Sequence, residues 1–83
     1  MVQMTIEIPE TALASLGKDP ATFAREMRLA AAVKWYELRV LSQERAAELA
    51  GLSRSQFLEA LGRFGVFPLQ YDADELIEES QRG

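Results

Sequence analysis

Apolar residues recur at helical spacing over residues 42–63, SQERAAELAGLSRSQFLEALGR, in the pattern of a helix-turn-helix. A first helix is predicted for residues 43–50. Gly51 would end it, because glycine has no Cβ to oppose a positive φ, and Ser53 would cap a second helix. The apolar sides would hold Ala46, Ala47 and Ala50 in the first helix and Phe57, Leu58 and Leu61 in the second.

The N-terminal residues alternate between apolar and polar side chains. One side of an extended chain would carry Val2, Met4, Ile6 and Ile8, and the other side Gln3, Thr5 and Glu7. This period of two predicts a short, half-buried β-strand.

Proline and glycine mark the boundaries of the helices that follow. Pro9 can be the first residue of a short helix, which Gly17 would end. Asp19 and Pro20 would cap and open a long helix that reaches about Val40.

The C-terminal residues predict two further short elements. Residues 66–71 would be extended, and Pro68 cannot donate to a β-ladder. Asp72 would start a helix to about Ser80 as a capping box with Glu75. The predicted fold is mainly α, with a short N-terminal β-strand, a long helix, a helix-turn-helix and a short C-terminal extended segment and helix. Residues 1–71 would form the body, with the helix-turn-helix at 42–63, and residues 72–83 an acidic arm.

The long helix carries more apolar surface than one core needs. One stripe holds Phe23, Met27, Ala30, Ala31 and Leu38, and a second holds Leu29, Val33, Tyr36 and Val40. A chain of 83 residues has little means of burying both, and uncovered apolar patches usually mark interfaces. We expect a homodimer, formed through the second stripe or through the N-terminal strand. Alternatively, the N-terminal strand, the short helix and the C-terminal segment cover both stripes.

Composition limits the chemistry of this chain. It has no cysteine and no histidine, which removes the commonest metal ligands and the commonest general base. It also lacks a glycine-rich phosphate loop and a nucleophile–base pair. We therefore expect no enzyme activity, no metal ion and no cofactor. No signal peptide or membrane-spanning run is visible, which predicts a cytoplasmic protein without membrane contact.

The net charge of -4 is unevenly distributed. Residues 72–83 hold five acidic side chains and one arginine, so residues 1–71 are neutral. A neutral body attracts phosphates weakly, because counterion release scales with the number of Lys and Arg contacts. The acidic arm has few apolar anchors and would be ordered by a partner. The alternative is a solvated tail that aids solubility.

The start of the second helix has side chains that suit DNA. In DNA-binding units of this kind, that helix lies in the major groove and its first residues reach base edges. Arginine to guanine and glutamine to adenine are favoured pairings. The alternative is a packing unit that binds protein or has only a structural role. The candidate DNA-binding residues are Ser53, Arg54, Ser55, Gln56 and Glu59.

Nearly the whole chain resembles a small prokaryotic family of antitoxin-like proteins, one of the "uncharacterised protein family" series. The resemblance is carried by TIEIPE, AAVKWYE, S-x-x-x-AAELAGLSR-x-x-FL-x-x-L and G-V-x-P-x-x-YD-x-x-EL. It implies a DNA-binding transcriptional regulator that acts as an antitoxin, binds an operator in its own promoter and pairs with a PIN-type ribonuclease toxin. By position, residues 53–56 would face DNA and residues 71–79 the toxin. The partner-binding residues would be Tyr71, Asp72, Asp74, Glu75, Leu76 and Ile77.

The loop before the motif departs from this family pattern. Relatives often have a glycine-containing turn there, whereas this chain has Leu38-Arg39-Val40-Leu41. The departure would allow the long helix to continue and would change the orientation of the motif. The rival function is a protein-interaction module or structural adaptor that never contacts DNA.

Overall fold

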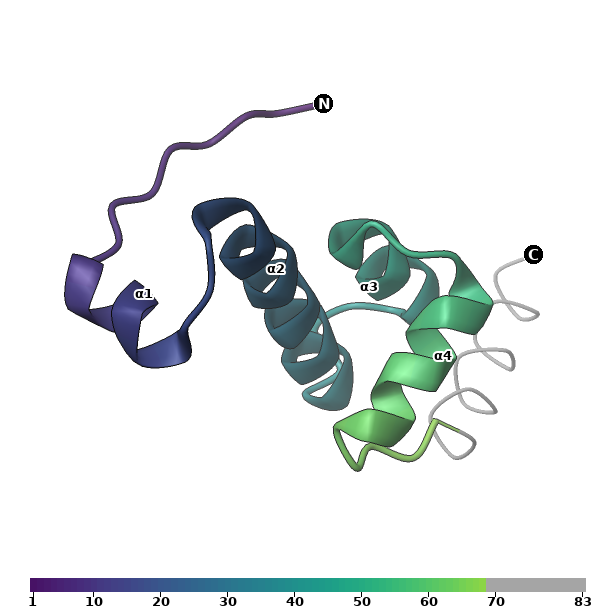
Figure 1. The fold of residues 1–83 in the computed structure, drawn as a ribbon. Helices are drawn as coiled ribbons and strands as arrows, with labels where there is room; N and C mark the ends of the chain where they lie inside the picture. The colour runs from purple at the N-terminus through teal and green to yellow at the C-terminus, as the bar shows by residue number, and fades with distance from the viewer. Residues whose placement is uncertain (69–83) are drawn as a thin grey trace.

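The computed structural model describes residues 1–68, and within them the chain forms four helices (Figure 1). The helices are α1 (Glu10–Leu16), α2 (Pro20–Glu37), α3 (Gln43–Ala50) and α4 (Arg54–Arg63). The prediction of a mainly α fold is confirmed. The predicted C-terminal helix and residues 69–71 of the extended segment before it lie outside the described residues.

Local chemistry sets the ends of the first two helices. Pro9 is the N-cap of α1, so the helix begins at Glu10, one residue later than predicted. Gly17 ends α1 with a φ of 64°. Asp19 caps α2, because the backbone N–H of Thr22 donates to its Oδ1 at 2.7 Å. This hydrogen bond from Thr22 is the main reason that the pKa of Asp19 lies below its ordinary value.

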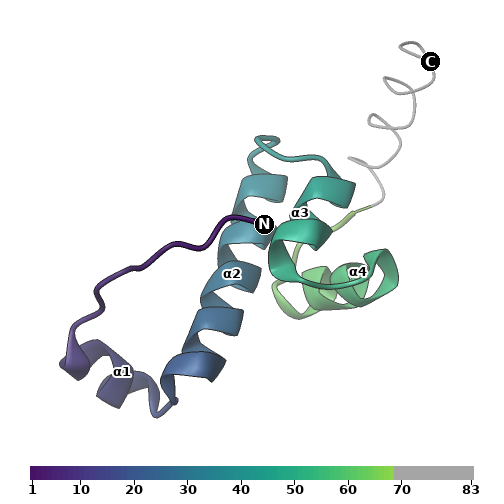
Figure 2. The ribbon, with the colours of Figure 1, turned by 90° about the horizontal axis from the view of Figure 1, so that it is seen from above.

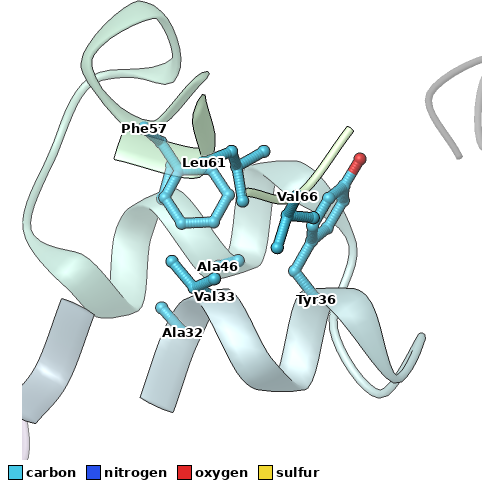
Figure 3. Packing of buried hydrophobic residues seen from close by; sticks show 8 residues of the cluster. Ala32, Val33, Tyr36, Ala46, Phe57, Leu61 and Val66 are labelled. Carbon is cyan, nitrogen blue, oxygen red and sulfur yellow. The ribbon is translucent and has the colours of Figure 1, made fainter. Parts of the chain in front are cut away.

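α2 lies between two different parts of the molecule, with α1 on one side and α3 and α4 on the other (Figures 1 and 2). The core is on the side of α3 and α4, where the Tyr36 ring meets the Phe57 ring edge to face at a centroid distance of 5.8 Å. Figure 3 shows most of this core. Its buried residues are Ala32, Val33, Tyr36, Ala46, Ala47, Phe57, Leu61 and Val66.

The second apolar stripe of α2 is used within the chain. Val33 is 4% exposed and Tyr36 is 1% exposed, and both belong to the core. Leu29 packs against that core, and Val40 lies beyond the end of α2 with 65% of its surface exposed. The prediction of a dimer face formed by Leu29, Val33, Tyr36 and Val40 is therefore corrected. α3 and α4 of the same chain already cover Val33 and Tyr36 at the centre of that face.

The N-terminal strand prediction is wrong for the described residues. Residues 1–9 run as an arm without secondary structure (Figure 1). Val2 is 87%, Met4 79% and Ile6 54% exposed, so the arm is not half-buried either. A strand needs a neighbouring backbone to pair with, and residues 1–68 of the same chain do not supply one.

α2 ends at Glu37, three residues before the predicted end at Val40. Arg39 then takes a left-handed conformation with a φ of 63°. The backbone N–H of Val40 donates to the carbonyl oxygen of Trp35 at 2.8 Å and closes the turn. The expectation that the helix would continue without a glycine is therefore wrong, since Arg39 makes the reversal that glycine favours.

Candidate DNA-binding site

The helix-turn-helix predicted over residues 42–63 is present as α3, a short turn and α4. The side chain of Ser42 caps α3 by accepting from the backbone N–H of Arg45 at 3.2 Å. Gly51 ends α3 with a φ of 72°, and Leu52 N–H donates back to the carbonyl oxygen of Ala47 at 3.0 Å. These bonds fix the angle at which the chain enters α4.

A capping box begins α4. The Gln56 backbone N–H donates to Ser53 Oγ at 3.2 Å, and the Ser53 backbone N–H donates to Gln56 Oε1 at 2.9 Å. Two candidate DNA-binding side chains therefore already have a structural task. Gln56 keeps its amide N–H groups available, but its acceptor is occupied.

Arg54 is attached to α3 through its side chain. Its Nε donates to Oε1 of Gln43, and Gln43 is 1% exposed. A guanidinium has five N–H donors, so a bond through Nε still leaves the two terminal amino groups for a ligand. The contact holds an exposed cation at the start of α4 in a defined direction.

The other two candidates are also exposed. Ser55 lies in the first turn of α4, with its Oγ 3.5 Å from Ser53 Oγ. Glu59 is one turn further along α4 and places a carboxylate on the same side. The structure therefore places four candidates at the N-terminal end of α4 and Glu59 near its middle, and only Arg54 among them is cationic.

Two supporting residues were missed by the sequence reasoning. Arg28 of α2 donates from Nε to the carbonyl oxygen of Leu49 at 2.9 Å and so holds the end of α3. A Cβ at Gly51 would lie 3.4 Å from Nη2 of Arg28, which shows how closely the arginine covers the turn. Gln43 is the second, as the buried acceptor for Arg54. Contacts between residues 11 and 21 positions apart leave no periodic signal in one sequence.

The described residues carry no net positive charge. They hold eight Lys and Arg and eight Asp and Glu side chains, so they are neutral as a set. Arg45, one turn into α3, pairs with Glu48 at 3.0 Å. Lys18 and Lys34 pair with Glu26 and Glu37 at 3.0 and 2.8 Å. Attraction to phosphates is therefore weak on this surface.

Residues 1–68 lack a metal cluster and a membrane-spanning helix. No cluster of three or more acidic side chains is placed to hold a metal ion in this part of the chain. None of its helices has the length and apolarity needed to cross a membrane. The predicted partner-binding residues Tyr71, Asp72, Asp74, Glu75, Leu76 and Ile77 lie outside the described residues.

The family of the chain is found by comparison with known proteins. The model of an "Uncharacterised protein family (UPF0175)" matches residues 1–82. A UPF0175 protein of Aeropyrum pernix is 36% identical over 77 residues, which cover 93% of this chain and 81% of that protein. A second UPF0175 protein of the same organism is 46% identical over 55 residues, or 66% of this chain and 70% of that protein. No solved structure matches. The chain belongs to the UPF0175 family.

Proposed function

We propose that this protein is a DNA-binding regulator in which α4 is the recognition helix. The observation that carries the proposal is the division of α4 into two faces. Phe57, Ala60 and Leu61 are fully buried against α2 and α3, while Ser53, Arg54 and Ser55 are exposed at its N-terminal end. Helix-turn-helix units that bind DNA present this end of the second helix to base edges.

Arg54 is the residue that would read a base. A guanine offers two acceptors in the major groove, and an arginine can bond both through its terminal nitrogens. The bond from Nε to Gln43 limits the rotation of the guanidinium, which lowers the entropy lost on binding. Ser53 and Ser55 would contribute hydroxyl contacts to phosphate or base.

Gln56 has a smaller part than the sequence indicated. Bidentate recognition of adenine needs both the oxygen and the nitrogen of the amide. Here the oxygen already accepts from Ser53 N–H, so only its second lone pair is left for adenine, and the capping box fixes the direction of the amide. We assign Gln56 to the cap, with at most one hydrogen bond from its nitrogen to DNA. Glu59 would accept from cytosine or disfavour phosphate nearby.

The test is fluorescence anisotropy with a labelled duplex from the region upstream of the gene, and a scrambled duplex alongside. Arg54→Ala is expected to cost about 1–3 kcal/mol of specific binding. Arg54→Lys keeps the charge but loses the planar fork, so it should lose specificity and keep the affinity for the scrambled duplex. Arg45→Ala is the matched control, since it removes one exposed cation from α3 and should leave specificity unchanged. Equal binding of both duplexes by the wild type would refute the proposal.

We further propose that the regulator is an antitoxin whose acidic residues 72–79 bind a basic partner, a PIN-type ribonuclease encoded beside it. Residues 72–83 carry five acids and one arginine, so they complement a basic protein surface. Co-expression with the neighbouring gene tests this. The full chain should relieve growth arrest and a chain shortened after Tyr71 should not, whereas relief by both would exclude a role for these residues.

The rival function is a protein-interaction module or structural adaptor. It is favoured by the occupied acceptor of Gln56 and by the carboxylate of Glu59 on the exposed side of α4. The anisotropy experiment separates the two functions. An adaptor would show no specific DNA binding in any variant and would keep its partner binding when Arg54 is replaced.

A further inference from the structure

The N-terminal arm borders an open apolar groove. Its apolar lining includes Met4, Ile6 and Ile8 of the arm, Leu13 of α1, and Phe23 and Met27 of α2. The groove has a volume of about 460 Å³. α1, which contributes Leu13 to its lining, lies on the side of α2 away from α4 (Figures 1 and 2). The first stripe of α2, which includes Phe23 and Met27, is thus the apolar surface that the body leaves uncovered.

The chemistry of the groove disfavours a polar ligand. Thr5 supplies the one hydroxyl side chain among the lining residues, and no charged side chain lines it. Small-molecule sites usually combine apolar walls with several converging polar groups, and DNA needs cations. An occupant with apolar side chains and an unpaired backbone fits better.

The arm itself has these properties. Among the described residues, none forms a backbone hydrogen bond with residues 1–8. Val2, Met4 and Ile6 remain more than half exposed, and they alternate with the polar Gln3, Thr5 and Glu7. An edge of this kind pairs readily with a second strand. A lone two-stranded ribbon is marginal in water, but packing against helices stabilises it, and α1 and α2 provide that surface.

We propose that two copies of this chain pair through their N-terminal arms as a two-stranded antiparallel ribbon, whose apolar face closes the groove of each copy. The proposal does not depend on DNA binding. It replaces the face of Val33 and Tyr36 as the dimer contact, since that face is buried within each chain. The interface is isologous, as is usual for homodimers.

The sequence selects one register for this ribbon. Alternation must be kept across the pair, and all four apolar residues find an apolar partner only when Thr5 lies opposite the partner's Thr5. Val2 then faces the partner's Ile8, and Met4 faces the partner's Ile6. Shifting by one residue in each chain leaves Val2 or Ile8 without an apolar partner.

Charge favours the same register. Glu7 is the only charged side chain of residues 2–8, and like charges directly opposite destabilise a ribbon. With Thr5 on the two-fold axis, Glu7 lies opposite the partner's Gln3, whose amide can donate to the carboxylate. The two Glu7 side chains are then four residues out of step, about 14 Å apart along the strand.

Single cysteines test the register directly, because the chain contains none. Under mild oxidation, the full-length Thr5→Cys variant should form a covalent dimer, since directly opposed residues in a ribbon meet the distance that a disulfide needs. The Gln3→Cys variant should stay monomeric on a non-reducing gel. A mixture of Gln3→Cys and Glu7→Cys chains should cross-link. Equal cross-linking of the Thr5 and Gln3 variants, or none of the Thr5 variant, would overturn the proposal.

Light scattering gives a second readout that does not depend on oxidation. The wild type should have the mass of a dimer at micromolar concentrations, and Ile6→Lys should reduce it to that of a monomer. Gln3→Lys is the matched control on the polar face and should remain dimeric, because its ammonium would lie opposite the partner's Glu7. Since Ile6 lies outside the buried core, circular dichroism should show unchanged helix content. A wild-type monomer, or a dimer that survives Ile6→Lys, would show that residues 69–83 or another partner covers the groove instead.

Discussion

The two sides of α2 have similar apolar patterns, but the chain covers one side and leaves the other side partly open. On one side, α3 and α4 cover Val33 and Tyr36, which are 4% and 1% exposed. On the other side, Phe23 and Met27 face a groove that the arm and α1 leave open. Both sides carry apolar residues at helical spacing, so the pattern alone does not tell them apart. The difference comes from what the chain can bring to each side.

The side of α2 that faces the helix-turn-helix is covered because helix caps and a turn direct α3 and α4 toward it. Serine caps at positions 42 and 53 and a left-handed glycine between them aim α3 and α4 back at α2. The arm has no comparable turn, because Pro9 at its end and Glu10 lead directly into α1 and do not form a hairpin turn. An extended segment without a hairpin depends on a partner from elsewhere.

The largest expected effect comes from truncating one aromatic ring on each side. Phe57→Ala should lower the free energy of unfolding by about 3–5 kcal/mol, because the ring is fully buried and contacts Tyr36. Phe23→Ala should cost about 1 kcal/mol or less in dilute protein, since Phe23 is only partly buried. Urea unfolding followed by circular dichroism measures both.

Protein concentration sharpens this comparison. If two copies close the groove, the wild type gains stability with concentration, and the cost of Phe23→Ala grows with it. The cost of Phe57→Ala should not change with concentration. Equal costs for the two variants in dilute protein would mean that the N-terminal side is as closed as the other.

The parts that sequence predicted well are those set within a few residues. The caps at Asp19 and Ser53 and the glycine ends at Gly17 and Gly51 are each decided by hydrogen bonds across three or four positions. Such signals are complete in one sequence. The helix-turn-helix and the location of its exposed candidates followed from them.

The failures have the opposite character. Which stripe of α2 meets α3 depends on the turn after Glu37, and Arg39 makes that turn with a conformation that its residue type does not announce. The hydrogen bond from Arg54 to Gln43 is likewise set by tertiary structure. The capping box of Ser53 and Gln56 is local, and its three-residue spacing was a signal that the sequence reasoning missed. Residue type therefore predicted which side chains reach the end of α4, but not which of their atoms remain available.

The next largest effect on stability is expected from alanine at Gly51, compared with alanine at Gly17, which has the same backbone conformation. Gly51→Ala should destabilise the protein by about 1–2 kcal/mol, because a left-handed alanine is strained, and its Cβ would contact Nη2 of Arg28 at 3.4 Å. Gly17 has a similar φ of 64° but nothing within 4 Å of an added Cβ. Gly17→Ala should change the main unfolding transition less, because α1 lies outside the core of α2, α3 and α4. Differential scanning calorimetry provides the comparison, and equal shifts would couple α1 to that core.

A smaller effect is expected from the cap of α4. Ser53→Ala removes the acceptor for Gln56 N–H and should cost about 1 kcal/mol. That corresponds to a decrease in melting temperature of about 4–8 °C for a domain of this size. Ser15→Ala is the control, since Ser15 Oγ donates only to the carbonyl oxygen of Thr11 within α1. An unchanged melting temperature in the Ser53 variant would show that the capping box is not formed in solution.

The smallest expected effect is a pH dependence of the melting temperature that is caused by Asp19 at the start of α2. The pKa of Asp19 is lowered chiefly by the backbone N–H of Thr22, then by the Thr22 hydroxyl, while Arg25 adds a weaker attraction. A folded pKa below the unfolded value of about 3.9 means that the carboxylate stabilises the fold above that value. The contribution is lost as the pH falls through the lower, folded pKa. The difference in melting temperature between wild type and Asp19→Asn should therefore be constant from pH 7 to pH 5 and shrink below about pH 4. Asparagine is a good neutral cap, so this difference in melting temperature isolates the effect of the charge. A difference that stays unchanged at the lowest pH would show that the charge of Asp19 does not stabilise α2.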